Sequence, residues 1–566
     1  MKPARPSLFL QSNDIPMPTR LFLPGLAQRR AMKCLLALLC LPSLLIAQFN
    51  RQDTLRGSIT PERAWWDLTY YHLDITVNPA ERRIHGANTV QYRVLQPEAR
   101  MQIDLQPPMS ITAVEQAGDS LSFERDGNVY YIGMPLGLKE GEVYELRITY
   151  GGQPRVALRP PWDGGLTWET DQNGNPFVAT SCQGEGASMW WPCKDHMYDE
   201  PDSMLISVEV PDSLMNVSNG QLRSVEKHKR GTATYHWFVS NPINNYGVNV
   251  NIGDYVHWSE TYGGEAGPLQ CSYYVLRDNL EKAKEQFQQV PLMLEAFEHW
   301  FGPYPFYEDG YKLVEVPYLG MEHQSSVTYG NKYRNGYLGT DLSGSGWGKK
   351  FDFIIIHESG HEWFANNITY KDIADMWVHE GFTAYSEALY VDYHFGKAAG
   401  AAYVTGTRAN IMNDRPVIGP YGVNQSGSSD MYYKGSNMLH TIRAILDDDE
   451  RWRKVLRGLN RHFYHQTVNT QDIERYLIKH TGLKLEKVFD QYLRDVRIPT
   501  LEIERQRKRL KYRWTNVVEG FDMPVEVLVG GEQLRLKPTT SWKSKKLRRR
   551  KGKIKLDPDY YVELKR

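Results

Sequence analysis

Hydrophobic and polar residues alternate along much of the chain between about residues 65 and 253. The alternation is clearest at 70–77, 88–94 and 144–150, and turn-forming residues separate these segments. A period of two places one side of a strand in a core and the other toward solvent, as in all-β domains. The pattern therefore predicts an N-terminal antiparallel β domain, which we place at residues 48–254.

From about residue 255 the hydrophobic positions follow helical spacing instead. Helices are expected at 280–300, 434–447, 450–465 and 470–495, with a strand at 311–316. After Pro499 short alternating stretches return, at 501–503, 510–514 and 525–529. We therefore expect a multidomain α+β protein, in which an α/β domain at 255–497, helical in its C-terminal part, precedes a small β domain at 498–566.

Two further predicted helices carry residues with metal-ligand chemistry. His357 and His361 enclose Glu358 in an HExxH motif, and Glu380 follows after eighteen intervening residues. Residues four apart lie on one face of an α-helix, so both imidazoles can reach one ion. The apolar run at 351–356 predicts a buried start for the first helix. The amphipathic stretch 382–395, which ends at a glycine, predicts a second helix next to Glu380.

Two histidines and one carboxylate form the ligand set of a catalytic zinc site, because they leave the fourth tetrahedral position to water. Zinc lowers the pKa of that water to roughly 7, and Glu358, one residue after the first ligand, is the candidate general base. An HExxH motif can arise by chance, but Glu380 in the following helix argues against chance here. The motif predicts one Zn²⁺ per chain and hydrolytic chemistry.

Composition and charge exclude some classes of partner. The 566 residues are 41% hydrophobic, which is ample for several cores, and 67 Lys and Arg balance 67 Asp and Glu. We therefore expect no nucleic-acid partner. A basic segment at 543–555 holds nine Lys or Arg and no acid, and we interpret it as an exposed hairpin face rather than as a membrane or nucleic-acid patch. Nothing in the sequence specifies an oligomeric state.

The beginning of the chain has the pattern of a secretory signal peptide. Arg29, Arg30 and Lys33 precede an apolar run at 34–46 that ends at Ala47. Thirteen residues are too few for a spanning helix, so no transmembrane segment is expected in the mature chain. We expect residues 1–47 to be a leader, with export to the periplasm or the extracellular space after cleavage near Ala47. We expect the true start near residue 32; a long n-region and an uncleaved anchor are the alternatives.

Three cysteines follow the leader, namely Cys182, Cys193 and Cys271. Their odd number leaves at least one free thiol, so disulfides do not build this fold.

Several motifs together resemble the zinc aminopeptidases that include aminopeptidase N and leukotriene A4 hydrolase, the gluzincins with HExxH-x18-E. The segments that carry the likeness are Cys182-Gln183, 191–195, 320–324, 357–369, 375–382 and 432–435. They occur in the family's order and span roughly residues 65–500. The resemblance implies a thermolysin-like catalytic domain and hydrolysis of the first peptide bond of peptides with a free N-terminus.

The resemblance also implies roles for residues outside the zinc motif. Glu322, within the family's Gly-x-Met-Glu segment that includes Gly320 and Met321, would bind the substrate's α-ammonium group. Gln183 from the β domain would bind it from a second side. Tyr432 would donate its phenolic proton to the oxyanion that forms on the scissile carbonyl.

Three further residues lie near the ligands in the sequence. Asn366 and Asp375 match family positions that flank the ligands. Glu387 lies seven residues after Glu380, on the same helix face, and could orient a ligand histidine. Packing or capping roles are the alternatives for all three.

The sequence departs from the family pattern in two places. His323 stands where Asn is usual, and Leu319 takes the place of a Gly, so the first side-chain pocket or the backbone that receives the peptide could differ. The family's long helical C-terminal domain has no room here, from which we hypothesise a more open cleft that admits longer peptides. A zinc endopeptidase, and a non-catalytic peptide-binding module that retains the fold, are the alternative functions. An epoxide hydrolase side activity has no distinguishing residue.

Overall fold

The computed structural model of the chain describes residues 49–547 and 552–566. The predicted leader, with its cleavage site near Ala47, lies outside the described residues, as do four residues of the basic segment, 548–551. Two short helices begin the described chain, α2 (Arg51–Gly57) and α3 (Pro61–Ala64).

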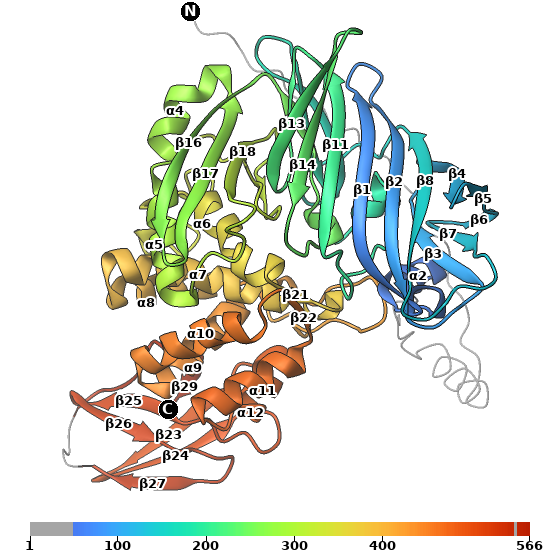
Figure 1. The fold of residues 1–566 in the computed structure, drawn as a ribbon. Coiled ribbons are helices and arrows are strands. Elements are labelled where there is room, and N and C mark those ends of the chain that lie inside the picture. The colour runs from blue at the N-terminus through green and yellow to red at the C-terminus, as the bar shows by residue number, and fades with distance from the viewer. Residues whose placement is uncertain (1–48, 548–551) are drawn as a thin grey trace, which may run out of the picture. The chain divides into compact units, whose positions relative to one another are not determined.

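The N-terminal part is built around an eight-stranded sheet (Figure 1). Along β1 the side chains of Leu73, Ile75 and Val77 are buried and those between them are more exposed, as the alternating pattern predicts. The strand order is β13-β14-β11-β1-β2-β8-β4-β5. In chain order these strands are β1 (Trp66–Asn78), β2 (Arg83–Val94), β4 (Ser110–Gln116), β5 (Asp119–Ser120), β8 (Val143–Gly152), β11 (Ser203–Pro211), β13 (Gln221–His228) and β14 (Thr232–Val239).

Two smaller sheets complete this part, and one strand pair departs from the expected antiparallel arrangement. The strands β1 and β11 are parallel, with Tyr70 opposite Ser203. The two strands are far apart in sequence, so no local pattern indicates whether they pair in a parallel or an antiparallel way. The smaller sheets contain β3 (Arg100–Asp104), β7 (Val129–Gly133) and β6 (Phe123–Asp126), and β12 (Met215–Val217), β15 (Asn251–Gly253), β10 (Pro176–Ser181) and β9 (Gly165–Thr170).

A mixed five-stranded sheet begins the middle part, in the order β16-β17-β18-β20-β19. The two strands β19 and β20 are antiparallel, and β19 forms the edge of the sheet. Hydrophobic residues of β18 and β19 pack into the core of the N-terminal part, which joins the two parts. The strands are β16 (Tyr255–Gly264), β17 (Gly267–Leu276), β18 (Tyr311–Glu315), β19 (Gly320–Met321) and β20 (Val327–Tyr329).

Helices cover this sheet and make up the rest of the middle part. They are α4 (Leu280–Gln286), α5 (Gln289–Phe301), α6 (Phe353–Gly360), α7 (Trp377–Phe395), α8 (Lys397–Gly406), α9 (Tyr433–Leu446), α10 (Asp449–His462), α11 (Thr470–Thr481) and α12 (Glu486–Leu493). A short parallel ladder joins β21 (Ile368–Tyr370) to β22 (Gln466–Val468), so the helix expected at 450–465 ends three residues early.

Two helices predicted as continuous are each divided. The expected helix at 280–300 is split into α4 and α5, and Pro291 occupies the first turn of α5, where the missing N–H costs nothing. The expected helix at 470–495 is split into α11 and α12 by Gly482, which ends α11 in the left-handed conformation at φ 65°. In both places the helix-breaking residue decides the boundary over the hydrophobic spacing.

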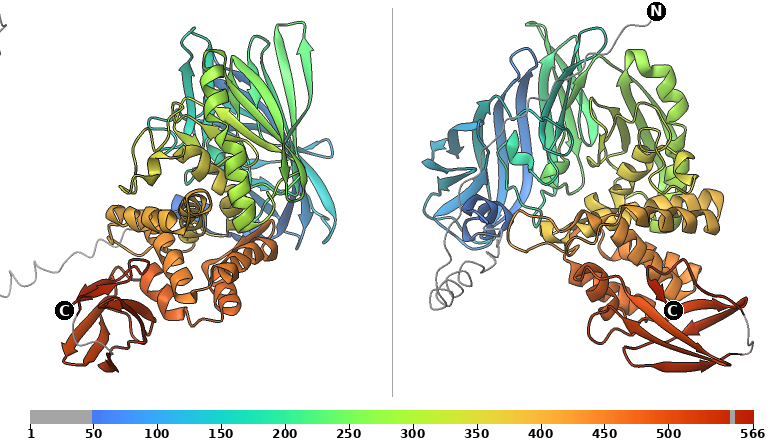
Figure 2. Two further views of the ribbon diagram at one scale, coloured as in Figure 1. Left: turned by 90° about the vertical axis from the view of Figure 1, so that its left-hand side faces the viewer. Right: turned by 180° about the vertical axis from the view of Figure 1, so that it is seen from behind.

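The C-terminal strands form two small sheets that share the hydrophobic core of the helices of the middle part. Both views of Figure 2 show the red strands against the orange helices. Tyr560 Oη donates to the carbonyl of Ala444 in α9 at 3.2 Å, and Tyr492 Oη in α12 donates to the carbonyl of Tyr561 at 2.7 Å. The strands are β23 (Thr500–Gln506), β24 (Arg509–Thr515), β25 (Val525–Val529), β26 (Glu532–Leu536), β27 (Lys543–Lys546), β28 (Ile554–Leu556) and β29 (Glu563–Lys565).

The basic segment does not form the hairpin we expected. Strand β27 pairs with β24, whereas β28 pairs with β25 in the other sheet. The described ends of the segment therefore belong to two different sheets. Within residues 49–547 and 552–566, no helix combines the length and the apolar character needed to span a bilayer, and Cys182, Cys193 and Cys271 are free and buried.

Candidate metal centre and active site

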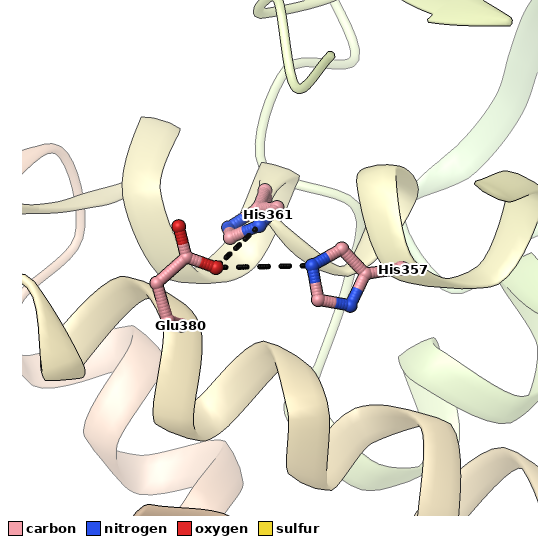
Figure 3. A group of neighbouring side chains, drawn as sticks. All are labelled: His357, His361 and Glu380. Carbon is pink, nitrogen blue, oxygen red and sulfur yellow. Dashed lines mark ion pairs between the residues drawn. The ribbon is translucent and has the colours of Figure 1, made fainter. Parts of the chain in front are cut away.

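His357, His361 and Glu380 converge on one point, as the spacing predicted (Figure 3). Glu380 Oε2 lies 3.7 Å from Nε2 of His357 and 3.4 Å from Nε2 of His361. All three side chains are buried. His357 is in the last turn of α6 and His361 caps its C-terminus. Helix α7 starts five residues earlier than predicted, which places Glu380 in its first turn.

The two helices that carry the ligands are fixed by a cap and a close approach. Asp352 accepts from the amides of Ile354 and Ile355 and caps the start of α6. A Cβ at Gly360 would lie 2.6 Å from Ser386 Oγ of α7, so only glycine lets the helices meet there. The sequence thus sets the distance between the histidine pair and Glu380.

The second nitrogen of each histidine is held by a neighbouring acceptor. His357 Nδ1 donates to Glu387 Oε1 at 2.7 Å, and Tyr403 donates to the other oxygen of Glu387 at 2.6 Å. His361 Nδ1 donates to the carbonyl of Phe364 at 3.0 Å, and Thr383 Oγ1 lies 3.1 Å from the same nitrogen. Both rings are therefore in the tautomer that leaves Nε2 free to bind an ion.

The electrostatics of this group fit a divalent cation. Glu380 Oε2, which faces both histidines, is buried and has no hydrogen-bond partner in the described part of the chain. Burial alone lowers the pKa of His357, yet the carboxylates of Glu380 and Glu387 raise it well above its usual value. The site therefore stabilises positive charge. Two imidazole nitrogens and a carboxylate oxygen with an unsatisfied lone pair match the ligand preference of zinc.

Glu358 lies in the same group but faces different neighbours. Its carboxylate, that of Glu322 and a nitrogen of His361 lie within 4.8 Å of one another. Burial is the main cause that raises the pKa of Glu358 to about 7. A carboxylate with a pKa near neutrality can both accept and return a proton at physiological pH.

Glu322 is bound by side chains from the N-terminal β part. Gln183 Nε2 donates to Glu322 Oε1 at 2.5 Å and to Glu380 Oε1 at 3.0 Å. Tyr246 Oη donates to Glu322 Oε1 at 3.1 Å. Burial raises the pKa of Glu322. Gln183 and Glu322 are 139 residues apart in sequence, and the fold brings them into direct contact beside the metal ligands.

Tyr432 reaches the site because α9 crosses α7 at two glycines. A Cβ at Gly435 would lie 3.0 Å from Cα of Gly381, so a larger residue would separate the helices. The ring of Tyr432 stacks at 6.1 Å from that of His357. Burial, followed by the charges of Glu380 and Glu322, raises the pKa of Tyr432 well above its usual value, and the phenol keeps its proton.

The remaining predicted residues support the site or lie outside it. Asn366 Nδ2 donates to the carbonyl of Glu322 at 2.9 Å and so fixes the backbone of the amine-binding candidate. Asp375 instead accepts from Thr470 Oγ1 at 2.5 Å and from Tyr421 Oη at 2.6 Å. These contacts tie the segment before α7 to the start of α11, which is a packing role.

Gly320 and Met321 form the edge strand β19, directly beside α6. A Cβ at Gly320 would lie 2.5 Å from Ile354 Cγ2, so the strand needs glycine to approach the helix. Leu319, at the departure from the family pattern, is half-buried, and its carbonyl accepts from Gly330 at 2.7 Å. His323, the other departure, is fully buried, and burial lowers its pKa to about 3, so it adds no charge.

Sequence reasoning missed three residues that complete the site, namely Tyr246, Thr383 and Tyr403. Thr383 had a usable signal, because it follows Glu380 by three residues and lies on the same helix face. Tyr246 and Tyr403 come from other elements of the fold, and nothing near them in the sequence indicated their contacts with Glu322 and Glu387.

Both domains of a known family match the chain. The Peptidase M1 N-terminal domain matches residues 68–246, and the Peptidase family M1 domain matches residues 285–492. Similar curated proteins include mouse endoplasmic reticulum aminopeptidase 1, at 26% identity over 52% of this chain and 32% of that protein. Mouse aminopeptidase B is 24% identical over 75% of this chain and 67% of that protein. Xenopus laevis leukotriene A-4 hydrolase is 22% identical over 75% of this chain and 70% of that protein. The chain thus spans about a third of the first relative.

Solved structures share the fold. An M1 zinc metallopeptidase from Deinococcus radiodurans superposes with a TM-score of 0.66, at 20% identity, over 77% of this chain and 95% of that one. A mutant of an M1 zinc metallopeptidase from the same organism, bound to a Tyr-Ser-Ala substrate, superposes with a TM-score of 0.64 at 20% identity, over 76% of this chain and 95% of that one. The resemblance inferred from the motifs is confirmed, and the chain belongs to peptidase family M1.

Proposed function

We propose that this protein is a zinc-dependent aminopeptidase that hydrolyses the first peptide bond of peptides with a free N-terminus. The observation that carries the proposal is the position of Glu322. Its buried carboxylate is bound by Gln183 at 2.5 Å and lies beside Glu358 and His361. A carboxylate at this place can bind an ammonium group next to the hydrolytic centre, which an endopeptidase does not need.

The metal would be held by His357, His361 and Glu380. Bound zinc would polarise the scissile carbonyl and make a water molecule acidic enough to be deprotonated near neutral pH. Glu387 and Thr383 keep the histidine rings oriented.

Glu358 acts as general base and then as general acid. One carboxylate oxygen takes a proton from the attacking water, and the same group returns it to the amine that leaves. The pKa of Glu358, raised to about 7 mainly by burial, suits both transfers.

Glu322 and Gln183 determine which bond is cut. The substrate's ammonium group would bind the Glu322 carboxylate and replace the present donors Gln183 and Tyr246 in part. The amide of Gln183 would then offer its oxygen to the ammonium after a rotation of its side chain. Because the amine is held close to Glu358, only the first carbonyl can reach the water.

Tyr432 and the edge strand β19 would bind the rest of the scissile unit. The phenol of Tyr432 keeps its proton, so it can donate a hydrogen bond to the oxyanion as charge develops there. Strand β19 pairs on one side only, with β20, and its free edge can bind the peptide backbone by strand addition.

The substitution Glu358→Gln tests the catalytic assignment. It preserves the size of the side chain and removes the base, so we expect bound zinc to stay near one per chain while kcat falls by at least about a hundredfold. The control Glu62→Gln removes a carboxylate from α3, outside the site, and should leave kcat unchanged. Turnover by Glu358→Gln at the wild-type rate would overturn the mechanism.

We also propose that the protein is exported. The leader pattern at 1–47 supports export, and fractionation with N-terminal sequencing of the mature protein tests it. A mature N-terminus far from residue 48, or retention in the cytoplasm, would refute export.

A further inference from the structure

A cavity lies between α10 and the chain that follows α5. Its volume is about 430 Å³, within the range of small-molecule sites. Aromatic side chains make up much of its lining, namely Phe301, Tyr304, Tyr307 and Tyr464. None of the predicted site residues lines it.

The hydroxyl groups of the tyrosines that line this cavity already donate hydrogen bonds within the protein. Tyr304 Oη donates to Gly310 O at 3.1 Å, Tyr307 Oη to Glu298 Oε1 at 2.7 Å, and Tyr464 Oη to Pro305 O at 2.9 Å. Tyr304 is only 2% exposed, so what Tyr307 and Tyr464 can offer a ligand is ring surface. Such a lining favours an aromatic or other hydrophobic group.

Two arginines on α10, one turn apart, line the same cavity, and they differ in their partners. Arg457 is bound to both oxygens of Glu265, at 3.0 and 2.6 Å. Arg461 is exposed and makes no ion pair with any residue in the described ranges. Glu308 lines the cavity as well, but no ion pair joins it to Arg461. The guanidinium of Arg461 therefore lies beside a partly aromatic wall without a carboxylate bound to it. A planar guanidinium binds a carboxylate through two parallel hydrogen bonds.

We propose that this cavity is a binding site for a small hydrophobic carboxylic acid. The carboxylate binds Arg461, and the hydrophobic part lies against the rings of Tyr307 and Tyr464. The lining of this site includes none of the residues assigned to the zinc centre. It selects for both halves of the ligand, because neither the apolar wall nor the single guanidinium suffices alone.

Calorimetric titration of the zinc-loaded enzyme with N-acetyl-L-phenylalanine tests this site. Its acetyl group removes the ammonium that Glu322 would bind. We expect saturable binding with one site per chain, and binding at least about tenfold weaker for N-acetyl-L-phenylalanine amide, which lacks the carboxylate. The substitution Arg461→Gln should weaken binding of the acid by at least about tenfold and leave peptide hydrolysis unchanged.

The matched control is Lys454→Gln, which removes one positive charge from the same helix two turns away and should leave the affinity unchanged. Equal affinity of wild type and Arg461→Gln for the acid would overturn the proposal, since the acid would then bind elsewhere, as at the zinc ion. Equal affinity for the acid and its amide would do the same. Binding of an N-acetylated tripeptide ending in phenylalanine more than tenfold tighter than the acid would show a peptide terminus, and not a small acid, to be the occupant.

Discussion

Glu387 provides a test of how the fold tunes its metal ligands. It is buried at 1% exposure and accepts from His357 Nδ1 at 2.7 Å and from Tyr403 Oη at 2.6 Å. A carboxylate in this position fixes the tautomer of the ligand histidine and makes its Nε2 more basic. Loss of the charge should therefore weaken zinc binding more than it weakens the fold.

The substitution Glu387→Gln separates these two effects. Its amide oxygen can still accept from His357 Nδ1, and its NH₂ group can donate to Tyr403 Oη, since that hydroxyl can rotate. We expect the folding free energy of the zinc-free protein to change by no more than about 1 kcal/mol. Zinc affinity should fall by about 10- to 100-fold, the usual cost of losing a carboxylate that orients a ligand histidine. Glu387→Ala would instead leave two buried donors without an acceptor, which should lower the folding free energy by about 1–3 kcal/mol for each donor.

Competition with a chromogenic chelator at fixed pH measures the zinc affinity, and thermal unfolding of the zinc-free proteins measures the cost to folding. Tyr403→Phe is the control, because it removes one hydrogen bond and keeps the charge of Glu387. That control should bind zinc within about threefold of wild type. Wild-type zinc affinity in Glu387→Gln would refute the reasoning.

Three other predictions follow from contacts in and beside the site. Gly435→Ala puts a Cβ at 3.0 Å from Cα of Gly381 and should move Tyr432. We expect kcat to fall by about tenfold or more while the zinc content and KM are retained. An unchanged kcat would contradict the proposed crossing of α7 and α9. In zinc-buffered calorimetry the unfolding midpoint should rise with free zinc, because the free energy of unfolding increases by about 1.4 kcal/mol for each tenfold increase in free zinc above the dissociation constant. A midpoint independent of zinc would contradict the metal site. Arg56→Met should raise KM severalfold with little change in kcat. Arg56 donates to the carbonyl of Glu185, close to Gln183 in the chain, and its Nη1 lies 3.3 Å from Asp195 Oδ2. An unchanged KM would show that α2 does not support the loop of Gln183.

The zinc ligands could be predicted because their geometry is local. His357 and His361 lie one turn apart on a single helix, and Glu380 and Glu387 lie two turns apart on the next, so helical periodicity fixes both pairs. The alternating strands at 70–77 and 144–150 were recognisable for the same reason. Each signal is contained within one element of secondary structure.

Contacts between distant elements could not be worked out from the residues themselves. Gln183 and Tyr246 meet Glu322 only after the β part has folded onto the five-stranded sheet. The direction of β11 beside β1, and the separate sheets of β27 and β28, likewise depend on tertiary packing. Gln183 was named through the family resemblance, whereas Tyr246 had no such guide.

The split helices show a different kind of error. Pro291 and Gly482 were visible in the sequence, and each is a known helix boundary signal. The hydrophobic spacing on either side continues with the same period, and it outweighed the breaker in our prediction. The structure follows the backbone constraint in both places.

The central claim is that a carboxylate beside a zinc site makes this enzyme an aminopeptidase. Mass spectrometry of the products from one peptide, with a free and with an acetylated N-terminus, tests it most directly. The account predicts stepwise loss of N-terminal residues from the free peptide by the zinc-loaded enzyme, and no products from the acetylated peptide. Internal cleavage of the acetylated peptide at a comparable rate would contradict it and would favour an endopeptidase.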